Sequence, residues 1–142
     1  MPKSWELDDE TVLRLSGIAC AGYATLMLAA PRRCHDIYYE LQAGALASDE
    51  HVATARWVGQ SMTGNALTAL AVGLSTNSKD AKKNMLKAGG TTWAFASAMH
   101  LINVNSGVQK KDVGLSSAAF AALMSGLCLW RGFAKDDEGK AT

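Results

Sequence analysis

The stretch Val113–Trp130, VGLSSAAFAALMSGLCLW, contains no charged side chain, although Asp112 precedes it and Arg131 follows it. Residues four apart are neighbours on an α-helix. A face of small residues lets a second helix approach closely, which is how helices commonly pack in a membrane. The stretch therefore predicts a membrane-spanning helix with a small-residue packing face. The residues of this face are Gly114, Ala118, Ala122 and Gly126.

Three further windows without charge precede this one, at Leu15–Pro31, Trp57–Ser78 and Ala88–Gln109. A surface helix in water usually carries a polar or charged face along its length. Four uncharged windows of roughly spanning length instead favour membrane helices. The predicted fold is all-α, an integral membrane four-helix bundle. The expected spans are residues 11–30, 55–75, 86–105 and 113–131, with a polar tail at 134–142.

Length, charge and motifs limit the functions to consider. A chain of 142 residues predicts a single membrane domain, and a net charge of +1 gives no field that would attract nucleic acid. The sequence contains no Ser-His-Asp pattern, P-loop or dinucleotide fingerprint, so no catalytic residue is predicted. No carboxylate lies within the four windows, which argues against a proton-coupled pump.

The connection at residues 32–55 is the longest in the chain. Pro31 is expected to end the first helix. Apolar residues then recur loosely as far as Leu46, which predicts a short interfacial helix between the first two spans. Ser48, followed by Asp49 and Glu50, is typical of the start of the next helix.

Two further faces are expected to pack against protein. Gly90, Ala94 and Ala98 repeat the small-residue spacing within the third window. A polar seam occupies the second window, where hydrogen-bonding groups at membrane depth need partners. It would either line a substrate path or, as we favour, pack between helices. The seam consists of Gln60, Ser61, Asn65 and Thr68.

His100 is the only histidine within an uncharged window. It is a candidate ligand for a chlorophyll magnesium or a haem iron. We favour the alternative, a hydrogen bond to Asn65 or Ser97, because a haem in a bundle normally needs a second axial ligand and none is evident. Chlorophyll, carotenoid and lipid are the cofactors that such a helix surface could bind.

A polar cluster follows the first span and contains Arg32, Arg33, Cys34, His35 and Asp36. Its spacing matches no common zinc pattern, so a cationic interfacial rim is favoured over a metal site. Cys20 and Cys128 lie in apolar windows and are interpreted as small hydrophobic residues. No metal site is therefore predicted.

The distribution of lysine and arginine predicts the orientation in the membrane. Nine lie on the side of the termini and the 75–87 turn, and five lie on the other side. Cytoplasmic loops carry the excess of positive charge. Both termini are therefore expected to face the cytosol, or the stroma or matrix of an organelle.

The helix layout resembles that of the small DoxX-like four-helix membrane proteins. The resemblance covers most of Arg14–Arg131 and rests on three quoted segments. It implies a fold only, since that group has varied roles and no catalytic residues can be carried over. The segments are LMLAAPRR, ARWVGQSMTGNALTALAVG and the pair WAFASAMHLINVNSG and LSSAAFAALMSGLCLW.

In style, the Ala- and Gly-rich helices are also similar to accessory subunits of photosynthetic (photosystem I-like) or respiratory membrane complexes. We therefore expect a non-catalytic membrane subunit whose partners are other membrane subunits and the lipid bilayer. A photosynthetic complex in the thylakoid is favoured over a respiratory one in the mitochondrial inner membrane. The alternatives are a stand-alone DoxX-like transporter or redox-associated protein, and a soluble helical bundle.

Overall fold

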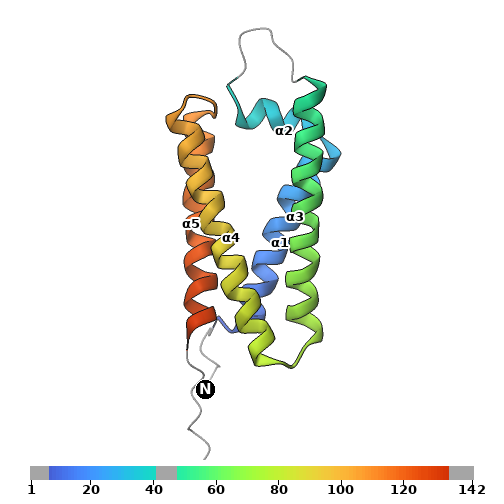
Figure 1. Cartoon of the computed structure of the whole chain (residues 1–142), viewed down its shortest axis with the longest axis vertical. Coiled ribbons are helices and arrows are strands. Elements are labelled where there is room, and N and C mark those ends of the chain that lie inside the picture. The colour runs from blue at the N-terminus through green and yellow to red at the C-terminus, as the bar shows by residue number, and fades with distance from the viewer. Residues whose placement is uncertain (1–6, 41–47, 135–142) are drawn as a thin grey trace, which may run out of the picture.

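The computed structural model describes residues 7–40 and 48–134, which form five α-helices and no strand. Four long helices run along the molecule, and a short one lies across one end (Figure 1). The all-α class is confirmed. A short helix does follow the first span, but it lies at Pro31–Tyr38, before most of the stretch ending at Leu46 from which it was predicted, and residues 41–47 of that stretch lie outside the described residues. The helices are α1 (Asp9–Ala29), α2 (Pro31–Tyr38), α3 (Asp49–Ser75), α4 (Lys79–Asn105) and α5 (Lys111–Phe133).

Side-chain caps set where three of the four long helices begin. The carboxylate of Asp8 accepts a hydrogen bond from the Thr11 backbone N–H at 2.7 Å, which starts α1. The Ser48 hydroxyl caps α3 by accepting a hydrogen bond from the His51 backbone N–H. The Ser78 hydroxyl caps α4 by accepting one from the Ala81 backbone N–H. These caps lie in the charged loops. Both helices therefore begin several residues before the uncharged windows from which their spans were predicted.

Pro31 does not simply end the first helix but begins a second one. It occupies the first turn of α2, where its missing N–H leaves no hydrogen bond unmade. The chain turns between Ala29 and Pro31, so α2 runs across the end of the bundle rather than along it (Figure 1). Pro31 and Cys34 are buried on its inner side, whereas Arg32 and Arg33 are exposed.

The four long helices form two close pairs, α1 with α3 and α4 with α5. Glycines allow the close approach. A Cβ atom added at Gly17 would lie 2.7 Å from Leu70, and one at Gly90 would lie 2.7 Å from Leu129. In each pair, therefore, a leucine of one helix fills the space that a glycine of the other leaves open.

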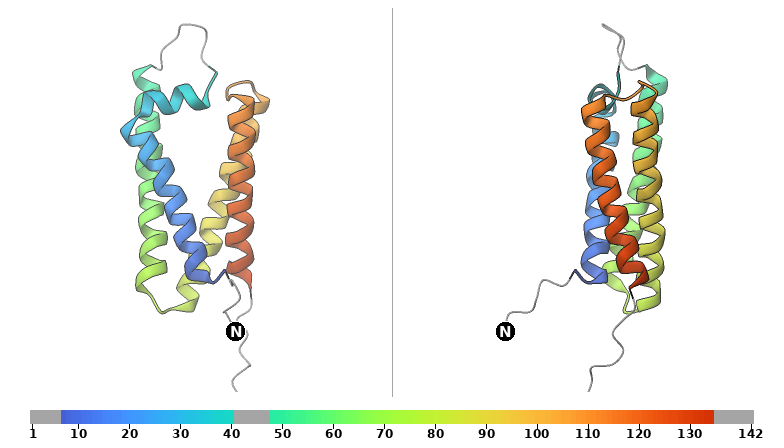
Figure 2. Two further views of the ribbon diagram at one scale, coloured as in Figure 1. Left: turned by 180° about the vertical axis from the view of Figure 1, so that it is seen from behind. Right: turned by 90° about the vertical axis from the view of Figure 1, so that its left-hand side faces the viewer.

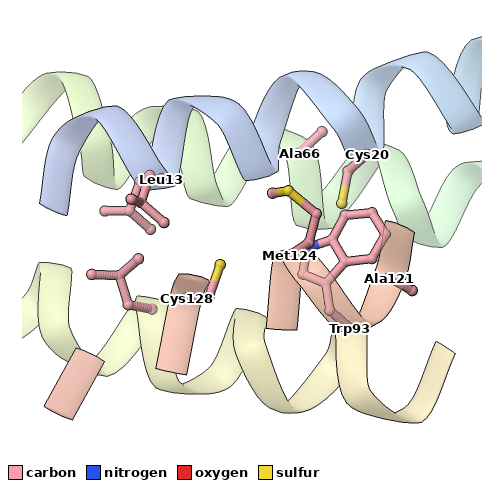
Figure 3. Close-up of a cluster of buried hydrophobic side chains, with 9 residues drawn as sticks. Leu13, Cys20, Ala66, Trp93, Ala121, Met124 and Cys128 are labelled. Carbon is pink, nitrogen blue, oxygen red and sulfur yellow. The ribbon is translucent and has the colours of Figure 1, made fainter. Parts of the chain in front are cut away.

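A compact apolar core joins the two pairs in the lower half of the molecule (Figure 3). One hydrogen bond crosses it, from the Trp93 ring N–H to the Ser16 hydroxyl at 2.9 Å, and links α4 to α1. Several core residues are small, so few large side chains are buried. The buried residues of the core are Val12, Leu13, Cys20, Ala66, Leu86, Trp93, Ala121, Met124 and Cys128.

An ion cluster closes the lower end, where α1 begins and α5 ends. The Asp9 carboxylate lies 3.0 Å from Lys83 and 2.8 Å from Arg131, and its side chain is only 14% exposed. The neighbouring Glu10 pairs with Lys82 at 3.4 Å. These five residues, the basal ion cluster, connect α1 to both α4 and α5.

The upper end is held differently, by backbone contacts between α2 and the α4–α5 turn. Tyr38 accepts a hydrogen bond from the Lys110 N–H, and Val108 accepts one from the Glu40 N–H, both at 3.0 Å. Gly107 has a φ of 73°, which a residue with a side chain rarely adopts, and permits this turn. The two pairs diverge towards this end, and α2 spans the distance between them (Figure 2).

The packing face predicted for the last span is only half correct within the chain. Gly114 and Ala118 are buried, whereas Ala122 and Gly126 are exposed. Four residues turn an α-helix by about 40° more than a full circle. Residues spaced by four therefore move progressively around the helix and away from the surface that contacts the neighbouring helix. On the buried face, successive residues are separated alternately by four and three positions in the sequence. It contains Gly114, Ala118, Ala121, Ser125, Cys128 and Gly132.

The same drift affects the face predicted for the third span. Gly90 is buried, but Ala94 and Ala98 are exposed. The inward face of α4 instead continues from Gly90 to Trp93 and the half-buried Ser97. Whether the exposed alanines contact another protein stays a prediction.

The polar seam as a whole does not point into the bundle as expected, although Asn65 also borders a small cavity beside Ser16, Cys20 and Trp93. All four of its side chains are exposed. Ser61 donates to the Trp57 carbonyl at 3.1 Å, and Thr68 donates to the Gly64 carbonyl at 2.9 Å. Hydroxyl groups on a helix can thus be satisfied by their own backbone, without a neighbouring helix.

Two of the four long helices, α1 and α5, are long and apolar enough to cross a membrane. The other two, α3 and α4, fall below that hydropathy because of their Ser, Thr, Asn and Gly content. Length and composition thus support two spans rather than the four expected.

A pair of glycine substitutions tests the packing of α4 against α5. Gly90→Ala should lower the free energy of unfolding by about 1–3 kcal/mol, because the new methyl group would overlap Leu129. Gly126→Ala is the matched control. It has nothing within 4 Å and should be neutral or stabilising by about 0.5–1 kcal/mol. Thermal unfolding followed by circular dichroism measures both, and equal effects would contradict this packing.

Candidate functional site

All three histidines of the chain lie at the end that carries α2. His35 is on α2, His51 is in the first turn of α3, and His100 is near the end of α4. No sequence periodicity relates the three positions. They come together because α2 folds back over α3 while its end contacts the α4–α5 turn.

Two adjoining cavities open beneath α2, with volumes of about 380 and 220 Å³. We call them together the upper chamber. They share four lining residues: Met27, Cys34, Tyr39 and Val58. The first cavity is also lined by His35, His51, Thr54 and Ala55, and the second by Tyr23, Tyr38, Met62, Trp93, Met99 and His100.

Three rings form a stack at the wall of the first cavity. The His35 ring lies 4.6 Å from the Tyr39 ring and 4.4 Å from the His51 ring, with interplanar angles of 27° and 23°. The stack fixes the plane of the His35 imidazole between α2 and α3. It also gives this wall of the cavity a flat aromatic surface.

The Nδ1 atom of His35 is buried and has no hydrogen-bond partner among the described residues. An unpaired buried polar group costs about 1–3 kcal/mol, so such an atom is unusual in a stable fold. Burial lowers the pKa of His35, the nearby His51 lowers it further, and Asp36 opposes both. His35 is therefore mainly neutral at pH 7, with one nitrogen as donor and the other as acceptor.

His51 has one nitrogen already engaged. Its Nδ1 accepts a hydrogen bond from the Ser48 backbone N–H at 3.3 Å, as part of the cap of α3. In the neutral ring, the proton therefore lies on Nε2. His51 thus has an N–H donor available at the first cavity, which it lines.

The Cys34 thiol and the phenols of Tyr38 and Tyr39, near α2, are held in their uncharged forms. Burial raises the pKa of the Cys34 thiol, whose residue is only 3% exposed. Burial likewise raises the pKa of Tyr38 and Tyr39. A thiol with a raised pKa is a poor nucleophile. Cys34 therefore lines the chamber as a small apolar group and as a weak hydrogen-bond donor.

His100 is hydrogen-bonded, as favoured from the sequence, but to a different partner. Its Nδ1 lies 3.0–3.1 Å from the side-chain amide of Gln109, a residue that is 3% exposed. Of the two expected partners, Ser97 donates to the Ala118 carbonyl, and Asn65 lines a separate cavity of about 60 Å³. Gln109 lies outside the helices, so helical spacing could not identify it.

A tetrapyrrole does not fit inside the chamber next to His100. The second cavity, at about 220 Å³, is smaller than the roughly 300–1,000 Å³ typical of small-ligand pockets. A chlorophyll or haem at His100 would have to lie on the outside of the bundle. Its role as a pigment ligand stays a prediction.

The chamber offers little charge to a ligand. Glu40 is the only charged residue among its described lining residues. Within residues 7–40 and 48–134, no three His, Cys, Asp or Glu side chains are placed to hold a metal ion. Arg32 and Arg33 are exposed on the outer side of α2, as expected of a cationic rim.

No protein-family model, curated protein or solved structure matches the chain. The resemblance to DoxX-like proteins therefore stays a prediction.

The pKa of His35 can be measured directly, because the chain contains only three histidines. Proton NMR titration of the imidazole signals should show His35 titrating below its ordinary pKa of about 6.5. His51→Gln should move that pKa upwards, since it removes a neighbouring positive charge at low pH. His100→Gln is the control, because His100 is not among the groups that shift His35. A His35 pKa unaffected by His51→Gln would contradict the stacked arrangement.

Proposed function

We propose that the chain is an integral membrane subunit without catalysis of its own, which packs through its outer helix faces into a larger membrane complex. The observation that carries this proposal is the outward position of large apolar side chains. Each long helix has one that is more than 60% exposed within its uncharged window. They are Ile18 (63%), Leu67 (64%), Phe95 (69%) and Leu123 (62%).

Such a surface is unfavourable in water but suits a lipid bilayer. Leaving a large apolar side chain exposed to water forgoes about 1.5–3 kcal/mol of burial free energy. Soluble monomers rarely expose apolar patches larger than a few hundred Å². α1 and α5, with 21 and 23 residues, extend roughly 30–35 Å, which matches a hydrocarbon core of about 30 Å.

The charges fit the same placement. Among the described residues they gather at the two ends of the bundle, and none lies within the four uncharged windows. We therefore propose that α3 and α4 also cross the membrane, each paired along its length with an apolar helix. Their lower hydropathy suits helices that are covered by protein on more than one side.

Two outward features favour partner subunits over lipid alone. Gln60 and Asn65 expose amide groups within the uncharged window of α3, and such groups are costly against hydrocarbon. Ala122 and Gly126 form a flat exposed strip on α5, where nothing lies within 4 Å of a Cβ added at Gly126. Flat and polar faces of this kind suit contact with another transmembrane helix.

The kind of complex remains the proposal made from the sequence: a photosynthetic complex in preference to a respiratory one. Mild-detergent extraction from native membranes, with sizing and an absorption spectrum of the fraction that contains the chain, tests it. Migration in a large chlorophyll-containing particle supports the thylakoid proposal, and a haem-containing particle supports the respiratory one. Release by alkaline carbonate without detergent would refute membrane integration altogether.

The upper chamber favours a second candidate, the stand-alone membrane protein that binds or moves a small molecule. A pure packing subunit has no need of a cavity lined by three imidazoles. Migration as a small colourless species in the same experiment would favour this candidate and contradict the accessory role.

Ala122→Leu tests the packing face of α5. Because Ala122 is exposed, leucine there should leave the chain folded but obstruct a partner helix, at a cost of about 1–3 kcal/mol. Less of the variant should migrate with the large particle, as measured by immunoblot after native electrophoresis. Thr25→Leu is the control, since Thr25 is exposed on α1 near Ile18 and Leu28, which we assign to lipid. Equal assembly of both variants would mean that Ala122 faces lipid.

A further inference from the structure

We propose that the upper chamber binds a neutral amphiphile of the quinone class, with its carbonyl-bearing ring against His35 and His51 and its apolar tail in the second cavity. This inference goes beyond a packing role. It rests on the proposed membrane placement, which delivers such a ligand, but it does not depend on any partner subunit.

The size and lining of the chamber suit a small apolar ligand with a polar head. The first cavity, at about 380 Å³, is within the range of small-ligand sites. Its walls are mainly apolar, formed by Met27, Ala55 and Val58, and its polar groups gather on the side of α2 and the start of α3. This is the usual composition of a ligand pocket, in which a few polar groups fix the orientation.

The charges of the lining exclude other ligand classes. No lysine or arginine lines either cavity, so nothing there would neutralise a phosphate or a carboxylate. The described residues offer no group of three metal-binding side chains. A neutral ligand with hydrogen-bond acceptors fits the donors that remain, namely the imidazoles of His35 and His51 and the phenol of Tyr39, although the Glu40 side chain also lines the first cavity.

Two imidazoles supply hydrogen bonds at the head of the site. Nδ1 of His35 is buried and has no partner among the described residues, so a ligand atom that displaces the groups covering it and pairs with it would remove an existing energetic cost. His51 has its Nε2–H available, because its Nδ1 is occupied by Ser48. Quinone carbonyl oxygens accept such bonds. In the Tyr39–His35–His51 stack the neighbouring rings cover the faces of His35, so a planar ligand ring would meet the edge of the His35 imidazole.

The second cavity suits the tail. It adjoins the first one and extends between the helix pairs towards Trp93, a residue of the apolar core. Three methionines line it, and their unbranched, flexible side chains adapt to ligands of irregular shape. They are Met27, Met62 and Met99. The polar end of the chamber thus lies beneath α2, and its apolar end lies deeper in the bundle.

Binding of decylubiquinone to the purified full-length chain in lipid nanodiscs tests the proposal. Quinones quench indole fluorescence, and Trp93 lines the second cavity. Wild-type protein should show saturable quenching. His35→Phe keeps a ring in the stack but removes the nitrogen, and should weaken binding about threefold to tenfold. His35→Asn, which retains a polar atom near the Nδ1 position, should restore part of the affinity.

Two further variants separate loss of the site from loss of the fold. Ala55→Leu fills part of the first cavity without changing a histidine and should also weaken binding. Thr91 is exposed, and its hydroxyl bonds to the Lys87 carbonyl of its own helix. The Thr91→Ala variant should therefore bind the quinone as wild type does. Circular dichroism establishes that each variant is folded before its affinity is compared.

Three outcomes would overturn the proposal. The first is quenching that rises linearly without saturation, as for quinone dissolved in lipid. The second is equal affinity of His35→Phe and wild type. The third is equal competition by a saturated alcohol of the same chain length, which would show a lipid groove without recognition of carbonyl groups. Because the assay uses the chain alone, a failure to bind quinone would not contradict the proposed accessory role in a complex. Equally, a failure to assemble with partner subunits would not contradict quinone binding by the chain.

Discussion

One carboxylate, Asp9, holds three helices together at the lower end of the bundle. It lies within 3.0 Å of both Lys83 on α4 and Arg131 on α5, and the three side chains are only 12–24% exposed. Coulomb attraction in such a partly buried site is about 4 kcal/mol before the desolvation cost, which removes much of it. The ion cluster therefore does more to fix where the helices meet than to stabilise the fold. At the opposite end the two pairs are linked instead through α2, by backbone hydrogen bonds to the α4–α5 turn, and the pairs diverge there (Figure 2).

The distribution of side-chain size supports the proposal that the bundle lies in a bilayer. The contacts between helices use glycine, alanine, serine and cysteine, whereas leucine, phenylalanine and tryptophan often point outward. In water, this arrangement would forgo most of the hydrophobic stabilisation available to the chain. In lipid, apolar burial gives no such gain, and close backbone packing with interhelical hydrogen bonds becomes the main attraction. The bonds from Trp93 to Ser16 and from Ser125 to the Gly90 carbonyl are of this kind.

The sequence was sufficient to predict the helices but not to predict which of their faces are buried. Uncharged windows and the cap at Ser48 are local signals, and they predicted the long helices, whereas Pro31 was expected only to end the first helix and instead begins the short one. Only half of the packing face predicted for α5 lies inside the bundle, because spacing by four drifts around the helix and because Ser125 and Cys128 were not considered as contact residues. Whether its exposed half packs against a partner stays a prediction. The polar seam was misplaced for a related reason. A hydroxyl that bonds to its own helix gives no information about what lies beside it.

The candidate site could not be predicted, because it depends on contacts between distant segments. His35 and His51 are separated by a connection whose middle, residues 41–47, lies outside the described residues. No helical period relates them, and only the turn at Pro31 brings α2 over α3. The chamber is a consequence of the same geometry. Helices joined at one end by Asp9 and bridged at the other by α2 cannot pack along their whole length, and the space that remains lies beside the three histidines. A tightly packed bundle would gain contacts by closing that space. The backbone hydrogen bonds between α2 and the α4–α5 turn oppose such closure, so the chamber is built into the fold.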